Sequence, residues 1–290
     1  MEQTGLKKDA RQMKADALLL MVALVWGLTF VSVKNALVDI LPFTFNAIRF
    51  SLAFLFMLLF LRKNISSVSK KCAATGIIIG SVLFAGYSFQ TIGLQYTTAS
   101  NAGFITGLSV VLVPLFSVVW LKQVPSPYAM LGAFSAAFGL SFLSLSIPFS
   151  INIGDLLVLF CAVSFALHII LIGRYIKLYD TLTLVTIQIG TVATLSTICA
   201  LLLERQELVF SPNVVSALLV TAIPATALAY LIQNWAQRFT TPTRTAIIFS
   251  MEPVFSAIFA VILLSETLSG MDILGGILVL SGMLMAELKY

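Results

Sequence analysis

The stretch YSFQTIGLQYTT, residues 87–98, has a counterpart in YLIQNWAQRFTT, residues 230–241, which lies 143 positions later in the chain. Both stretches place Tyr, Gln and a Thr-Thr pair in the same register, and the match continues without a gap to Gly139 and Gly282. Chance similarity between apolar helices is the alternative, but it rarely reproduces shared polar positions. A shift of 139 aligns the earlier part of each half and pairs Asp16 with Asp155, Trp26 with Phe165, Thr44 with Thr183 and Arg49 with Gln188. The sequence therefore predicts two copies of one unit, residues 1–148 and residues 149–290.

The composition excludes a soluble protein. Of the 290 residues 59% are hydrophobic and 10% are charged, whereas soluble domains have about 45–50% apolar and about 25% charged residues. A helix needs about 20 apolar residues to cross a bilayer, and the long runs lack the alternation of barrel strands. We therefore expect an all-α integral membrane protein with ten transmembrane helices and no separate soluble domain. The expected spans are 17–38, 44–61, 73–95, 99–121, 128–147, 153–173, 182–203, 213–236, 243–264 and 271–287.

The basic residues predict the orientation of these helices. Alternate loops divide the 17 Lys and Arg residues into fourteen on one side and three, Lys34, Arg49 and Arg205, on the other. Basic residues favour cytoplasmic loops, so we expect both termini in the cytoplasm and the protein in the plasma (inner) membrane. The first apolar run follows basic residues as a signal peptide does, but it is longer than a signal h-region, and we expect a retained helix. Five helices in each copy is an odd number, so the second copy is expected to be inverted, which is the architecture of secondary transporters.

Three stretches resemble one known family. WGLTF (residues 26–30), TTASNAGFITGLSVVLVPLFSVVWLKQVPS (97–126) and TTPTRTAIIFSMEPVFSAIFAVILLSETLS (240–269) are similar to the drug/metabolite transporter superfamily, specifically its EamA-like family. The resemblance implies a gradient-linked or proton-linked carrier of small metabolites with a central cavity, often an exporter of amino acids or toxic cations. Gln123 stands where the second half and many members of the family have an acidic residue, here Glu266, so that position favours a structural role.

Glu252 is a single carboxylate inside an apolar stretch. A charge at the centre of a bilayer costs roughly 2.5–3.5 kcal/mol on insertion scales, so such residues face a cavity or a partner. Pro253 follows it, removes a backbone donor and bends the helix. One interpretation is a hydrogen bond from a neighbouring helix that only fixes packing. The other is a cavity residue that binds a cationic group or takes a proton, which makes Glu252 the first candidate for proton coupling.

His168 is the second candidate for proton coupling, because imidazole changes charge near physiological pH. A structural role as a neutral donor to a carbonyl is the alternative. The pairs Tyr87 with Gln90 and Tyr230 with Gln233 each share one helix face. We expect them in the substrate cavity, with Tyr87 toward the outside and Tyr230 toward the cytoplasm as two gates, although they could instead bridge helices.

Trp26 and Thr29 lie one turn apart at middle depth, where Trp is unusual because it prefers the membrane interface. Substrate stacking and core filling are both open interpretations, and we place both residues among the cavity candidates. Lys34 and Arg49 fall near the predicted outer ends of their helices. We expect them to be charges at the outer mouth, where they either snorkel to the surface or attract a carboxylate.

These observations predict a secondary-active transporter, an exporter of amino acids or related metabolites that works by alternating access and with protons as the candidate coupling ion. An exporter of organic cations is the alternative, and an intramembrane enzyme is a remote one because the motifs of intramembrane proteases are not matched. Cys72, Cys161 and Cys199 lack metal spacing, so we expect no metal and no cofactor. The expected partners are a small-molecule substrate and the lipid bilayer, without nucleic acid, and the expected oligomeric state is monomer or homodimer.

Overall fold

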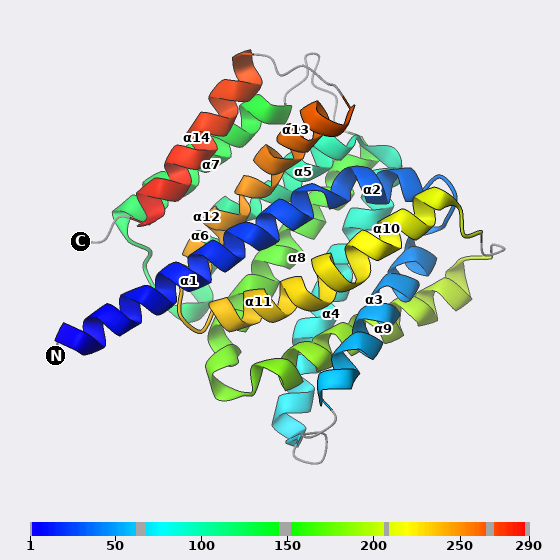
Figure 1. Ribbon diagram of the computed structural model, residues 1–290, viewed down its shortest axis with the longest axis horizontal. Coiled ribbons are helices and arrows are strands. Elements are labelled where there is room, and N and C mark those ends of the chain that lie inside the picture. The colour runs from blue at the N-terminus through cyan, green and yellow to red at the C-terminus, as the bar shows by residue number, and fades with distance from the viewer. Residues whose placement is uncertain (1, 62–67, 145–151, 206–208, 265–269, 288–290) are drawn as a thin grey trace.

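The computed structural model describes residues 2–61, 68–144, 152–205, 209–264 and 270–287, and this part of the chain forms helices without strands (Figure 1). The predicted boundary between residues 148 and 149, and Glu266, lie outside these ranges. The helical elements are α1 (Glu2–Gly27), α2 (Thr29–Ala36), α3 (Pro42–Leu61), α4 (Lys70–Tyr96), α5 (Ala99–Gly107), α6 (Ser109–Phe116), the π-helix η2 (Ser117–Leu121), α7 (Pro127–Ser144), α8 (Ile153–Tyr175), the 3₁₀-helix η3 (Ile176–Leu178), α9 (Thr181–Leu203), α10 (Pro212–Ala222), the π-helix η4 (Ile223–Leu228), α11 (Ala229–Ala236), α12 (Pro242–Phe249), α13 (Met251–Leu264) and α14 (Gly270–Glu287).

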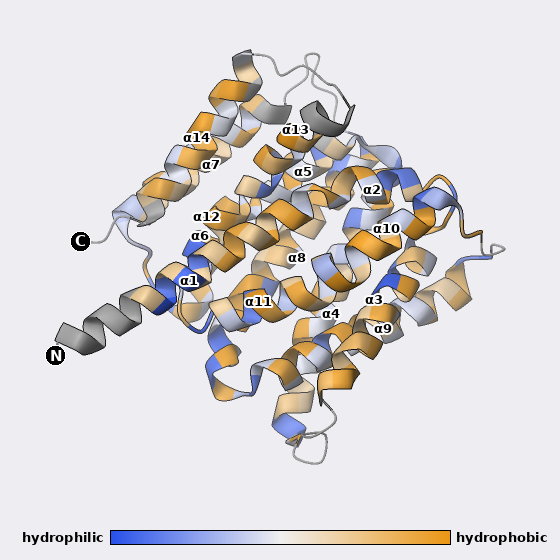
Figure 2. Ribbon diagram, viewed as in Figure 1, coloured by the Kyte–Doolittle hydropathy of each residue, from blue (hydrophilic) through white to orange (hydrophobic). Residues whose placement is uncertain are grey.

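Apolar residues dominate the length of the helices, and hydrophilic residues gather near their ends (Figure 2). The prediction of an all-helical membrane protein is confirmed. Two shorter apolar helices cover Pro127–Phe142 and Ile273–Met285. The predicted span 243–264 is divided at Ser250 into α12 and α13. Within the described residues, seven segments are long and apolar enough to cross a bilayer: Ala10–Ala36, Pro42–Phe60, Lys70–Tyr96, Asn101–Leu121, Ile153–Leu178, Thr181–Leu203 and Pro212–Ala236.

The starts of several helices follow from their sequence. A side-chain oxygen placed just before the first turn accepts a backbone N–H that the helix itself leaves unpaired. The α3 helix receives this cap from the end of α9, because the Glu204 carboxylate accepts the backbone N–H groups of Phe43 at 2.8 Å and Thr44 at 2.7 Å. The helices α4, α5, α8, α9, α10 and α12 have such a cap from Ser69, Thr98, Asn152, Asp180, Ser211 and Thr241.

The α7 and α14 helices pack side by side at one edge of the molecule, and α3 and α9 pack at the opposite edge (Figure 1). Glycine makes the first of these contacts possible. A Cβ atom on Gly139 would lie 2.6 Å from the carbonyl oxygen of Gly275, and one on Gly282 would lie 2.5 Å from that of Gly132. The two contacts are reciprocal, and they join the glycines that the shift of 143 aligns. Small residues at these positions let the two backbones touch, as in membrane helix pairs generally.

The α1 helix packs against α11, α12 and α13, and it passes especially close to the backbone of α13. A Cβ atom on Gly27 would lie 2.8 Å from the backbone oxygen of Glu252 and 3.0 Å from the backbone nitrogen of Ser256. The helix is interrupted immediately afterwards at Leu28, and the Thr29 hydroxyl donates to the carbonyl of Trp26 at 2.8 Å. The glycine of the WG pair therefore brings Trp26 and Glu252 to the same level of the bundle.

Candidate functional site

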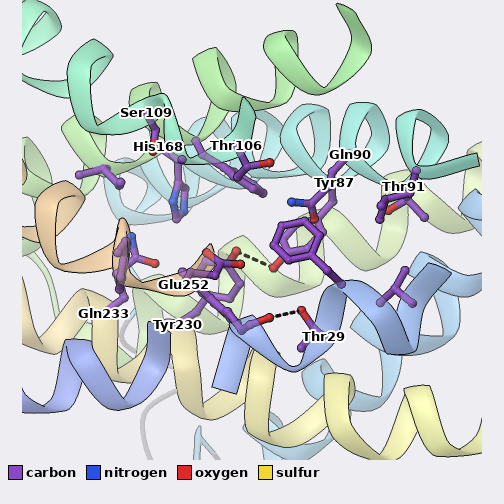
Figure 3. Close-up of a pocket in the computed structure, with 18 of the residues that line it drawn as sticks. Thr29, Tyr87, Gln90, Thr91, Thr106, Ser109, His168, Tyr230, Gln233 and Glu252 are labelled. Atoms are coloured by element: carbon purple, nitrogen blue, oxygen red, sulfur yellow. Dashed lines mark hydrogen bonds between the residues drawn. The ribbon is translucent and has the colours of Figure 1, made fainter. Parts of the chain in front are cut away.

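A cavity of about 50 Å³ lies in the middle of the bundle. Since one water molecule needs roughly 10–15 Å³ of such volume, the cavity has room for a few waters and must widen to hold a metabolite. Figure 3 shows labelled side chains converging on it from α2, α4, α5, α6, α8, α11 and α13. All eight residues that the sequence assigned to a cavity line it, namely Trp26, Thr29, Tyr87, Gln90, His168, Tyr230, Gln233 and Glu252.

The two repeated tyrosines meet in the centre. The Tyr230 hydroxyl donates to the Tyr87 hydroxyl at 2.8 Å, and both side chains are at least 95% buried. The prediction that they form two gates on opposite sides is therefore wrong, and the alternative that they bridge helices describes the contact. The estimate of depth from helix direction alone placed the two side chains too far apart.

Arg49 also differs from its predicted position. Its side chain is 3% exposed and lines the cavity, so it is neither a surface charge nor an outer-mouth charge. The Arg49 Nε donates to the Thr226 hydroxyl at 2.8 Å, and an Nη donates to the Tyr87 hydroxyl at 3.2 Å. The reason is that α3 begins at Pro42, which puts Arg49 about two turns inside the helix.

Lys34 lies at the end of α2 and outside the cavity lining. Its Nζ donates to the carbonyl oxygens of Leu94 and Thr97, at the C-terminal end of α4. A cation at this end satisfies unpaired carbonyls and the helix dipole. The geometry thus gives Lys34 a structural contact.

Glu252 lines the cavity from the first turn of α13, beside the close approach of Gly27. Across the ranges that the structure describes, no donor forms a hydrogen bond with its carboxylate. The described residues therefore provide no donor for the interpretation in which a hydrogen bond from a neighbouring helix fixes Glu252. A half-buried carboxylate that faces a cavity inside the bundle is suited to bind a cationic group or to exchange a proton.

His168 belongs to a chain of directed hydrogen bonds. The carbonyl of Tyr230 can only accept, so the Asn234 Nδ2 donates to it at 2.9 Å, and Asn234 Oδ1 accepts from Gln188 Nε2 at 3.1 Å. Gln188 Oε1 is then left to accept from His168 Nε2 at 3.1 Å. This chain joins α8, α9 and α11 and explains a buried histidine without proton transfer.

Replacing the central member of this chain should destabilise the protein. In Gln188→Leu, the N–H of His168 and the Oδ1 of Asn234 would both be buried without a partner, and each such group costs about 1–3 kcal/mol. We expect a lower melting temperature of the purified protein in detergent. Thr194→Val on the same helix is the matched control, because the exposed Thr194 hydroxyl only donates to the Gly190 carbonyl. Equal melting temperatures for the two variants would contradict the network.

Trp26 is held on three sides. Its Nε1 donates to the carbonyl of Ala225 at 2.8 Å, and its ring lies 5.5 Å from that of Tyr230 and 4.9 Å from that of Phe249. The Ala225 carbonyl belongs to η4, and π-helical turns free backbone groups for such contacts and occur often at functional sites. Trp26 therefore both fills space and forms a wall of the cavity.

Comparison with known proteins gives the family. The model of the EamA-like transporter family matches the chain twice, over residues 13–145 and 152–287. The chain belongs to the EamA-like transporter family. The resemblance seen in the sequence is thus confirmed, and the EamA-like family accounts for the helical membrane bundle with a central cavity.

Relatives of this EamA-like chain carry transporter names. An uncharacterized transporter of Archaeoglobus fulgidus is 38% identical over 99% of this chain and 90% of its own length. A second from the same organism is 28% identical over 95% of this chain and 98% of its own length. The uncharacterized transporter YoaV of Bacillus subtilis is 23% identical over 93% of this chain and 95% of its own. A solved crystal structure shares the fold with a TM-score of 0.80 at 19% identity, over 95% of this chain and 96% of that one.

Proposed function

We propose that this chain is a secondary-active transporter that exports amino acids or related small metabolites by alternating access. The observation that carries the proposal is the central cavity, which is lined by a buried cation, Arg49, and by Glu252, whose carboxylate accepts no hydrogen bond from the described residues. A zwitterion has the complementary pair of charges. The transporter names of the curated relatives support the transport class over an enzyme.

The proposal includes ten spans in two inverted copies, residues 1–148 and 149–290, with both termini in the cytoplasm. Three observations support the two copies: the family model matches twice, the aligned glycines of α7 and α14 make reciprocal contacts, and the aligned tyrosines touch. The alternation of basic residues between loops supports the orientation. Inverted copies around a midplane site are the architecture in which access alternates as the copies rearrange.

Protons are the proposed coupling ion, and Glu252 is the proposed carrier. Substrate ammonium and proton would compete for one carboxylate, which is a direct way to link their movements. His168 is the weaker candidate, because its hydrogen bond to Gln188 already explains its burial.

A transport screen tests this function. Purified protein in liposomes would be given radiolabelled amino acids one at a time under an imposed pH gradient, with protein-free liposomes as the background. We expect at least one amino acid to accumulate above background. Movement of organic cations without any amino acid would replace the proposal by the second candidate, which the aromatic rings of Trp26, Tyr87 and Tyr230 in the cavity wall favour through cation–π contacts.

A further inference from the structure

Arg49 is a buried cation that the protein itself does not neutralise. Its side chain is 3% exposed, and its partners are the Thr226 and Tyr87 hydroxyls and the Ala225 carbonyl, which are all neutral. Over the described ranges, no carboxylate lies within 4 Å of its guanidinium nitrogens. A buried charge without a counter-ion is costly, and membrane-embedded charges of this kind mark substrate pathways. The guanidinium is therefore placed to receive an anion from outside the chain.

Acceptors for a cation line the same cavity. The Glu252 carboxylate has no donor within the described part of the chain, and Gln233 is 1% exposed with its Oε1 buried and without a hydrogen-bond partner. A buried acceptor left unpaired is likewise costly. The cavity thus offers one positive group without a counter-ion and two acceptors without a hydrogen-bond donor, as far as the described residues show.

This polarity departs from the repeat. Arg49 aligns with Gln188, and Glu252 aligns through the shift of 143 with Ser109, so each charged residue has a neutral counterpart. The shared positions, such as Tyr87 and Tyr230, carry the structural contact between the halves. In the cavity, Arg49 and Glu252 stand at positions that the two copies do not share, as expected for a site that binds an asymmetric ligand.

We propose that Arg49 binds the carboxylate of the transported molecule at the centre of the cavity, while Glu252 and Gln233 accept its ammonium N–H groups. The site would then select zwitterionic amino acids over the corresponding amines by the planar, bidentate fit of guanidinium to carboxylate. This inference rests on the proposed function and adds to it the residue that recognises the carboxylate.

The test uses three matched sets of probes. Each set holds an amino acid, the amine that lacks its carboxylate and the acid that lacks its amino group: alanine, ethylamine and propanoate; leucine, isopentylamine and 4-methylpentanoate; phenylalanine, 2-phenylethylamine and 3-phenylpropanoate. Binding to the full chain in nanodiscs would be measured by calorimetry for wild type, Arg49→Gln, Arg49→Lys and Arg174→Gln. Gln is the residue at the aligned position 188, and Arg174 is an exposed arginine whose loss removes the same charge from the surface.

In at least one set, wild type should bind the amino acid at least about 30-fold more tightly than the amine, and Arg49→Gln should remove that preference while changing amine affinity by less than about threefold. Arg49→Lys keeps the positive charge but lacks the planar, bidentate guanidinium, so its affinity for the amino acid should be about tenfold lower than that of wild type. This variant serves as the test if Arg49→Gln is not monodisperse. Arg174→Gln should match wild type.

Three outcomes would overturn the assignment. Arg49→Gln could lose affinity for amine and amino acid equally, or it could keep the preference of wild type for the amino acid over the amine. Wild type itself could bind amino acids no more tightly than amines. Transport of the same probes separates this inference from the proposed function. If Arg49→Gln transports amino acids and still prefers them to the matched amines, only the role of Arg49 is removed. An Arg49-dependent preference in binding without net transport of any amino acid removes only the export function.

Discussion

Glu252→Gln should reduce accumulation driven by a pH gradient to the level of protein-free liposomes. The amide cannot take up or release a proton, yet it keeps the shape of the side chain and an oxygen that can accept an ammonium N–H. Exchange of labelled for unlabelled substrate at saturating concentration needs no proton, so it should stay within about threefold of wild type. Both rates can be measured on one preparation of proteoliposomes.

The matched control for this variant is Glu204→Gln, which makes the same chemical change at the cap of α3, outside the cavity lining. It should lower the melting temperature and keep the dependence of transport on the pH gradient. If Glu252→Gln still accumulates substrate along a pH gradient as wild type does, Glu252 is not the proton carrier. If exchange is lost together with accumulation, its role is in substrate binding alone.

Gly139→Ala should destabilise the bundle by about 1–3 kcal/mol, the usual cost of adding a methyl group to a closely packed contact. The new Cβ would lie 2.6 Å from the Gly275 oxygen and 2.8 Å from the backbone nitrogen of Val279, so it meets backbone that cannot rotate away. Unfolding of the purified protein with increasing dodecyl sulfate in mixed micelles would measure the loss.

Gly276→Ala on α14 is the control for the glycine contact, because its Cβ would meet only the Val254 Cγ1 at 3.7 Å, an ordinary contact. It should be neutral or slightly stabilising, since alanine loses less backbone entropy on folding than glycine. Gly282→Ala should resemble Gly139→Ala, and the double variant should lose less than the sum because both methyl groups separate the same two helices. Similar stabilities of the Gly139 and Gly276 variants would contradict the packing.

The sequence predicted the class of fold and eight of the residues that line the cavity. Long apolar runs leave only helices in a membrane, and polar residues inside such runs must face one another. Glu252 was found in this way, Tyr87 and Tyr230 were found from the repeated register, and Trp26 was found because Trp is unusual at middle depth. The family resemblance rested on the same stretches and was confirmed.

The position of Arg49 could not be read from helix ends. Its depth depends on where α3 begins, and Pro42 marks that start more closely than the end of the apolar run does. The alignment with Gln188 held the missing signal, since Gln188 is fully buried and both residues then lie at one level. The partners Thr226 and Asn234 were missed because a helix face is fixed only by its neighbours, and η4 alters the facing of the residues around it.

The π-helical turn η4 lies directly before α11, where a change of helical pitch would rotate α11. A π turn holds more residues than an α turn, and rewinding it would rotate α11 about its own axis by roughly 100° for each residue absorbed. Such a twist would carry the Tyr230 hydroxyl off Tyr87 and withdraw the Ala225 carbonyl from Trp26. One local change of helical pitch would therefore break a contact to α1 and a contact to α4 at the same moment.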